Sequence, residues 1–141
     1  MLNNTDRVRP AAIQFLKTGA YTTALPGTKE YYEHWDEERS RCLYGYTVDK
    51  GTDTEFKVTG FHYFYLNYCP IDRAIDEELP DGTIQSRRER TFPRFYDGDW
   101  DYFNEIDKAR AENKHMIVLK ARRKGYSYKA GSMLARNYFF I

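Results

Sequence analysis

The feature that most constrains the fold of this chain is a short apolar run that leads into a basic loop near its end. Residues 115–119 form the apolar run, and the loop 120–127 carries one glycine and one serine. An amphipathic segment over 127–141 then repeats apolar side chains at helical spacing. The order of a strand over 115–119, a loop over 120–127 and a helix over 127–141 is the framework of a phosphate-binding loop.

Two helices are predicted near the start of the chain. Pro10 suits the first position of a helix over 10–18, and Gly19 suits the residue that follows its end. Thr28 can cap a second helix that runs over 29–41. Two short strands, 44–48 and 55–58, flank the turn 49–52 and predict a hairpin.

An almost continuous aromatic run over 59–71 follows the hairpin. Its periodicity does not choose between a helix and a strand, but so many rings predict burial. The polar stretch 72–90, which contains Pro80, Asp81 and Gly82, is interpreted as a loop or linker and as a domain boundary. A helix with Asp99 as its N-cap is then predicted to end near Asn113.

These elements predict an α/β protein. Residues 1–85 form a mainly helical, aromatic-rich N-terminal subdomain, and residues 86–141 begin a phosphate-loop NTPase core with a parallel sheet. Because the chain stops on apolar residues in the middle of the last predicted helix, we expect it to be truncated.

The charge of the chain gives no global argument for a nucleic-acid partner. The 22 Lys and Arg residues nearly balance the 21 Asp and Glu residues. The basic residues nevertheless gather in two clusters. These are Arg87, Arg88, Arg90 and Arg94 in the first, and Lys120, Arg122, Arg123, Lys124 and Lys129 in the second. Together with the tyrosines they leave open a nucleic-acid-binding module without enzymatic activity.

The loop matches the standard phosphate-loop pattern at two of its four diagnostic positions. Gly125 stands at the second glycine and Ser127 at the hydroxyl, whereas Lys120 replaces the first glycine and Tyr126 replaces the lysine. Four cations within the loop could serve a phosphate in place of that lysine: Lys120, Arg122, Arg123 and Lys124. On the residues alone, a basic surface turn between a strand and a helix stays the alternative.

Three segments resemble bacteriophage terminase large subunits, the motor ATPases that package viral DNA. The loop Lys120-Ala121-Arg122-Arg123-Lys124-Gly125-Tyr126-Ser127 resembles their deviant phosphate loop, in which the lysine is displaced to the front. The aromatic segment 60–71 is similar to one that precedes their ATPase core, and 92–96 lies where they hold an adenine-side segment. Another phosphate-loop motor, such as a helicase, is the alternative within this class.

The resemblance implies a role for each residue of the loop. Residues 120–127 would hold the phosphates of ATP, and Ser127 would ligate Mg²⁺. Lys120 would replace the usual lysine as a catalytic cation, with Arg122 as a second cation or as the residue that couples hydrolysis to movement. Phe95 and Tyr96 are candidates for stacking on the adenine, with core packing as the alternative.

The resemblance also implies partners and a location. These would be double-stranded viral DNA, the portal protein, the small terminase subunit and further copies in a homo-oligomeric motor. The protein would act in the host cytoplasm and transiently at the procapsid portal, neither secreted nor in a membrane. The chain contains neither the acidic Walker B strand, the catalytic glutamate nor the nuclease domain of that family, so we expect it to be inactive alone.

Other kinds of site are not favoured. An EF-hand that starts at Asp97 would need glycine at Tyr102 and glutamate at Lys108. The three histidines and two cysteines have no zinc-ligand spacing, so Cys42 and Cys69 are interpreted as reduced thiols.

Overall fold

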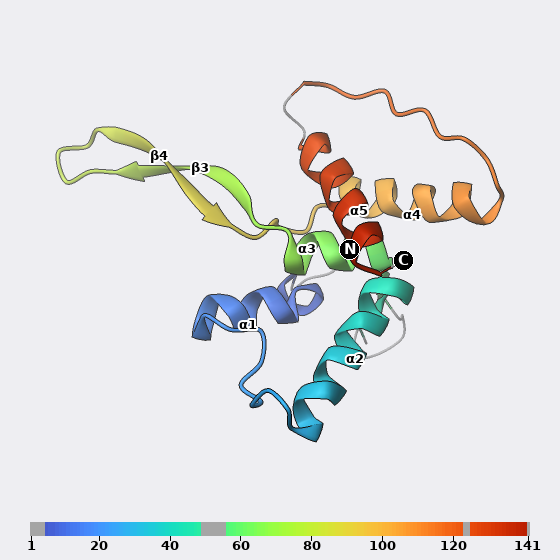
Figure 1. Ribbon diagram of the computed structural model, residues 1–141. Coiled ribbons are helices and arrows are strands. Elements are labelled where there is room, and N and C mark those ends of the chain that lie inside the picture. Colours follow the sequence, from blue (N-terminus) through green and yellow to red (C-terminus); the bar gives the residue numbers. More distant parts are fainter. Residues whose placement is uncertain (1–4, 49–55, 123–124, 141) are drawn as a thin grey trace.

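The computed structural model describes residues 5–48, 56–122 and 125–140 (Figure 1). In chain order the elements are the 3-10 helix η1 (Thr5–Val8), helices α1 (Pro10–Thr18) and α2 (Lys29–Tyr44), strands β1 (Tyr46–Val48) and β2 (Phe56–Val58), helix α3 (Gly60–Tyr68), strands β3 (Ile71–Glu78) and β4 (Ile84–Thr91), and helices α4 (Asp97–Ala111) and α5 (Tyr126–Phe140). None of the helices in these ranges is long and apolar enough to cross a membrane.

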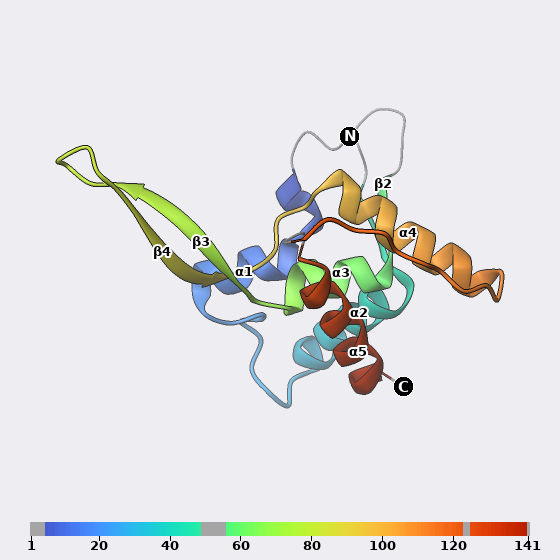
Figure 2. The ribbon, with the colours of Figure 1, turned by 90° about the horizontal axis from the view of Figure 1, so that it is seen from above.

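Helix α3 is the centre of the fold. It contacts α1, α2, α4 and α5, and Figures 1 and 2 show these helices arranged around it. All of its residues from Gly60 to Asn67 are buried, which explains why the aromatic run shows no periodicity. The Thr59 side chain caps the helix by accepting a hydrogen bond from the His62 N–H at 3.2 Å. The aromatic run is therefore a helix whose whole circumference lies in the core.

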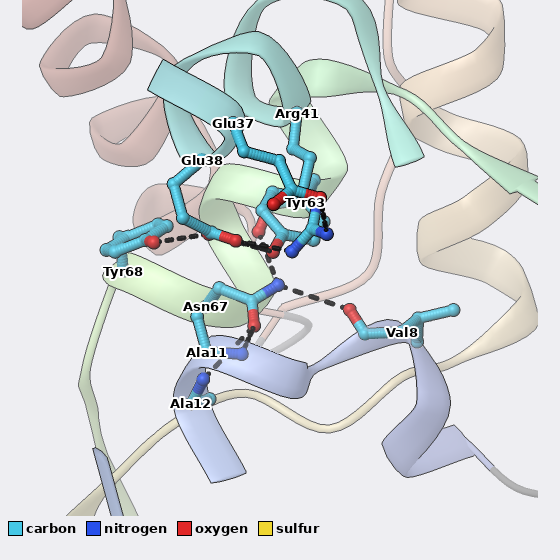
Figure 3. Close-up of polar contacts among 9 residues, drawn as sticks. All are labelled: Val8, Ala11, Ala12, Glu37, Glu38, Arg41, Tyr63, Asn67 and Tyr68. Carbon is cyan, nitrogen blue, oxygen red and sulfur yellow. Dashed lines mark hydrogen bonds and ion pairs between the residues drawn. The ribbon is translucent and has the colours of Figure 1, made fainter. Parts of the chain in front are cut away.

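A buried carboxylate joins α2 to α3 (Figure 3). Glu38 is 3% exposed and accepts hydrogen bonds from the hydroxyls of Tyr63 and Tyr68, while Arg41 forms an ion pair with it. Burial and the nearby Glu38 charge both raise the pKa of Tyr63 and that of Tyr68. Both tyrosines therefore stay protonated and remain donors to the carboxylate, which compensates for its desolvation.

The helix and turn signals of the first quarter are confirmed. Pro10 begins α1, and Gly19 follows it with a left-handed φ of 74°. The Thr28 hydroxyl accepts from the Tyr31 N–H at the start of α2, which continues beyond the predicted end at 41 to Tyr44. Strands β1 and β2 pair antiparallel as predicted, and their turn lies outside the described residues.

The predicted linker over 72–90 is wrong. Strands β3 and β4 form an antiparallel hairpin in continuous register from Ile71↔Thr91 to Glu78↔Ile84, and this hairpin projects far from the helices (Figures 1 and 2). We call it the arm. Gly82, with φ of 82°, and the Asp81 carboxylate, which accepts from Thr83, form its turn. The sequence does not predict these strands, because charged residues occupy both of their faces and the alternation of apolar and polar residues typical of a strand is missing.

The predicted parallel sheet is also wrong. The described residues contain two separate antiparallel pairs of strands, β1–β2 and β3–β4, so a phosphate-loop NTPase core is not supported. Residues 115–119, predicted as its first strand, lie in an irregular connection between α4 and α5. Ile117 is 88% exposed and Leu119 95% exposed, because no described strand runs beside them to pair with their backbone.

Candidate functional site

A cavity of about 640 Å³ lies where the first turn of α5 meets α3 and the start of α4. We call it the loop cavity. Its walls are Tyr65 of α3, Ile71 of β3, Tyr96, Gly98 and Asp99 at the start of α4, Leu119, Lys120 and Ala121 of the connection, and Gly125, Tyr126 and Lys129 at the start of α5. Aromatic and apolar surface therefore surrounds a few charged groups, which is the usual composition of a small-molecule site.

Five of the predicted site residues border this cavity. Lys120, Ala121, Gly125 and Tyr126 come from the predicted loop, and Tyr96 comes from the segment expected beside the adenine. Tyr96 is 58% exposed, so its ring is available to a ligand. The structure thus brings the front and back of the loop together with a separate aromatic side chain.

Other predicted residues lie elsewhere. Phe95 is buried in the core, with its ring 5.5 Å from that of Phe56 and 5.4 Å from that of His62, as expected of a packing residue. Arg122 and Ser127 are not among the residues of the cavity wall. Arg123 and Lys124 are outside the described residues.

The most buried charges at the cavity form an ion pair that the sequence did not indicate. Lys129 of α5 pairs through its Nζ with Asp99 of α4, and the two side chains are 3% and 11% exposed. The Lys129 Nζ also lies 4.2 Å from the ring centre of Tyr126 and 5.6 Å from that of Tyr102. Breaking such a buried pair would leave an uncompensated charge, so it fixes α5 against α4.

Burial around this ion pair shifts the pKa values of Asp99 and of two nearby side chains. Desolvation raises the pKa of Asp99, although the Lys129 ammonium opposes that rise. Desolvation, with the Asp99 charge as a second cause, raises the pKa of Tyr65, whose hydroxyl therefore stays protonated. His62 is completely buried, and its burial, reinforced by the Lys129 charge, lowers its pKa to about 3.

The predicted N-cap at Asp99 is wrong, because α4 begins two residues earlier, at Asp97. Asp99 therefore lies within the first turn, where its carboxylate reaches Lys129. Its partner is 30 positions away in the chain, and no spacing rule connects the two. The sequence does predict the aromatic contact of Lys129, because Tyr126 and Lys129 lie three positions apart and so share one face of a helix.

The start of α5 can receive an anion. The first N–H groups of a helix have no intrahelical partner and carry the positive end of its dipole. Gly125 precedes this helix with φ of 70°, a left-handed conformation that favours glycine. Its carbonyl accepts from the Lys129 N–H at 3.2 Å. An anion in the loop cavity would meet this helix end and the exposed side chain of Lys120.

The charges of the cavity decide what it can do chemically. Asp99 already compensates Lys129, which leaves Lys120 as the cation that can neutralise an anion among the described residues of the wall. Asp99 is also the one carboxylate among them. The described residues bring no three His, Cys, Asp or Glu side chains together in a metal-binding group. The arrangement suits the binding of an anionic ligand with an aromatic part.

Comparisons with protein families, with curated proteins and with solved structures found no match for this chain.

Proposed function

We propose that the loop cavity binds the phosphates of Mg-ATP, and that the chain is the N-terminal part of a viral DNA-packaging motor of the terminase large-subunit type. The observation that carries the proposal is a convergence of three segments. The aromatic segment contributes Tyr65 and Ile71, the adenine-side segment contributes Tyr96, and the loop contributes Lys120 and Gly125. These are the three segments that resemble the terminase family, and they border one cavity.

In the proposed complex, the β- and γ-phosphates lie at the start of α5. The N–H groups of its first turn face them, and the Lys120 ammonium supplies the positive charge. Tyr96 offers its exposed ring to the adenine. Ser127 lies on the first turn of α5 but outside the described cavity wall, so we assign it no contact with the Mg²⁺ that accompanies the phosphates.

We expect binding without turnover. Hydrolysis needs an oriented water and acidic groups that hold the metal. The one carboxylate among the described wall residues, Asp99, is engaged with Lys129. The partners of the whole motor (viral DNA, the portal protein, the small subunit and further large subunits) follow from the same resemblance.

The test is calorimetric titration of the chain with Mg-ATP, with Lys120→Ala as the main variant. We expect binding to weaken about tenfold or more, the size of a lost hydrogen bond to a charged group. Lys108→Ala is the matched control, because Lys108 is an exposed lysine on α4 that does not border the cavity, and it should bind as the parent does. Equal affinity in the Lys120 and Lys108 variants would contradict the site.

Circular dichroism of each variant shows whether weaker binding results from the loss of one contact or from unfolding of the chain. A folded parent chain that does not bind Mg-ATP would overturn the proposal. Binding of DNA that is independent of ATP and falls steeply with salt would instead indicate the nucleic-acid-binding module.

A further inference from the structure

The hydroxyl of Tyr65 is a polar group at the loop cavity that no described residue satisfies. Its side chain comes from the buried helix α3, is 4% exposed and packs its ring 5.7 Å from that of Phe103. The neighbouring tyrosines Tyr63 and Tyr68 both donate to Glu38. Among the described residues, by contrast, none forms a hydrogen bond with the Tyr65 hydroxyl. Because buried polar groups in folded proteins are almost always hydrogen-bonded, this hydroxyl lacks a partner that a ligand could supply.

The Tyr65 hydroxyl opens on the cavity. The described side-chain atoms that are both fully enclosed and without a partner belong to Arg9, His34, Trp35 and His62. The Tyr65 oxygen is not one of them, and Tyr65 lines the cavity. A Cβ added to Gly125 would meet one described atom outside the adjoining backbone, this same oxygen, at 4.0 Å. The hydroxyl therefore faces the residue that precedes α5, and the missing side chain of Gly125 keeps the space between them open.

The groups around this space favour an anionic oxygen as the ligand atom. Burial, with the Asp99 charge as a second cause, raises the pKa of Tyr65, so its O–H group is present as a donor. The first N–H groups of α5 and the ammonium of Lys120 border the same cavity. Asp99, the one carboxylate among the described wall residues, is engaged with Lys129. Several donors without a free carboxylate suit a group with more than one anionic oxygen, which is the chemistry of a phosphate.

We propose that the Tyr65 hydroxyl is a ligand-binding group of the loop cavity, which donates a hydrogen bond to a phosphate oxygen at the start of α5. This inference rests on the proposed function for the carrier of that phosphate, Mg-ATP. It adds that a side chain from α3, outside the loop motif, recognises the phosphate end of the ligand. The contact does not involve the base, so inorganic pyrophosphate meets the same donors as ATP does.

The test is calorimetric titration of Tyr65→Phe with Mg-ATP and with Mg-pyrophosphate. The substitution removes one oxygen and keeps the ring that packs on Phe103. We expect both ligands to bind about tenfold more weakly than to the parent chain, the size of a lost hydrogen bond to a charged group. Tyr46→Phe is the matched control, because Tyr46 is a partly buried tyrosine of β1 that does not border the cavity. It should bind both ligands as the parent does.

Thermal unfolding without ligand distinguishes a binding role from a structural one. Because the Tyr65 hydroxyl bonds to no described residue, Tyr65→Phe should unfold at the same temperature as the parent or slightly above it. A clear fall in the unfolding temperature of Tyr65→Phe, but not of Tyr46→Phe, would show that the hydroxyl supports the fold and would overturn the inference.

The two ligands separate this inference from the proposed function. If Tyr65→Phe binds both ligands as tightly as the parent, the inference is overturned and the ATP site stands. If the parent binds pyrophosphate as tightly as ATP, and Tyr65→Phe weakens both, the inference is supported while the proposed contact with the adenine is not. A folded parent chain that binds neither ligand would overturn both.

Discussion

At the scale of single residues, Asn67 shows how much of the fold can depend on one side chain. It is completely buried, and all of its amide groups are used (Figure 3). Its Oδ1 accepts from the N–H groups of Ala11 and Ala12 at 3.0 and 3.1 Å, at the N-terminal end of α1. Its Nδ2 donates to the carbonyls of Val8 and Tyr63 at 3.1 and 3.0 Å. Asn67 therefore caps α1 from α3, a role that Ser, Thr and Asp usually perform within one helix.

We predict that Asn67→Asp lowers the free energy of unfolding by about 3 kcal/mol or more at neutral pH. The substitution keeps the shape but places a second carboxylate oxygen against two carbonyl oxygens. Urea denaturation measures the loss. Asn104→Asp is the matched control, because Asn104 donates to a single carbonyl, that of Trp100, at a partly buried position. An equal loss in both variants would contradict the role assigned to Asn67.

At the scale of elements, three helices meet at the last turn of α2. The carbonyls of Cys42 and Leu43 accept from the Arg136 guanidinium of α5, both at 3.0 Å. Gly60, the first residue of α3, lies against the same two carbonyls. An added Cβ there would come within 2.5 Å of the Cys42 oxygen and 2.8 Å of the Leu43 oxygen. The absence of a side chain at Gly60 thus allows α3 to reach the centre of the fold.

Gly60→Ala should therefore destabilise the protein by about 2 kcal/mol, as overpacking of a rigid contact does. Gly131→Ala gives the opposite expectation. Gly131 lies within α5, and an added Cβ would meet nothing within 4 Å. The better helix propensity of alanine should stabilise that variant by about 0.5–1 kcal/mol. Thermal and urea unfolding show whether each substitution stabilises or destabilises the protein. A loss of stability in Gly131→Ala, or no loss in Gly60→Ala, would contradict this account.

At the scale of the whole molecule, the helix boundaries set by neighbouring residues could be predicted from the sequence. The contacts between segments that are far apart in the chain could not. Pro10, Gly19 and Thr28 act on neighbouring backbone, so α1 and the start of α2 could be predicted from the sequence. The arm and the exposed position of Ile117 depend on which strands lie side by side, and the residues encode this weakly. The same division holds at the cavity. Lys120 and Gly125 carry a local motif, whereas Asp99 and Lys129 meet because α4 and α5 both pack on α3.

His62 lies where three parts of the molecule meet, and it makes a prediction for the stability of the whole fold. Its ring stacks between Phe95, at 5.4 Å between ring centres, and Phe103 of α4, at 4.8 Å. The described residues offer neither ring nitrogen a hydrogen-bond partner. Its burial and the Lys129 charge lower its pKa from 6.5 to about 3. The imidazole is therefore neutral in the folded chain throughout the physiological pH range.

Because the folded pKa lies below the unfolded one, protons bind preferentially to the unfolded chain as the pH falls through 6.5. The contribution of neutral His62 to stability is complete above pH 6.5 and is lost as the pH falls toward 3. We expect a loss of about 2 kcal/mol by about pH 5 from this group.

His62→Phe keeps the stacked ring without a proton to bind, so its stability should fall by about 2 kcal/mol less over that interval. Urea titrations at about pH 7 and pH 5 measure the difference, with His115→Gln as the control for an exposed histidine. Equal acid sensitivity in the parent and in His62→Phe would mean that this histidine does not control the acid stability of the fold.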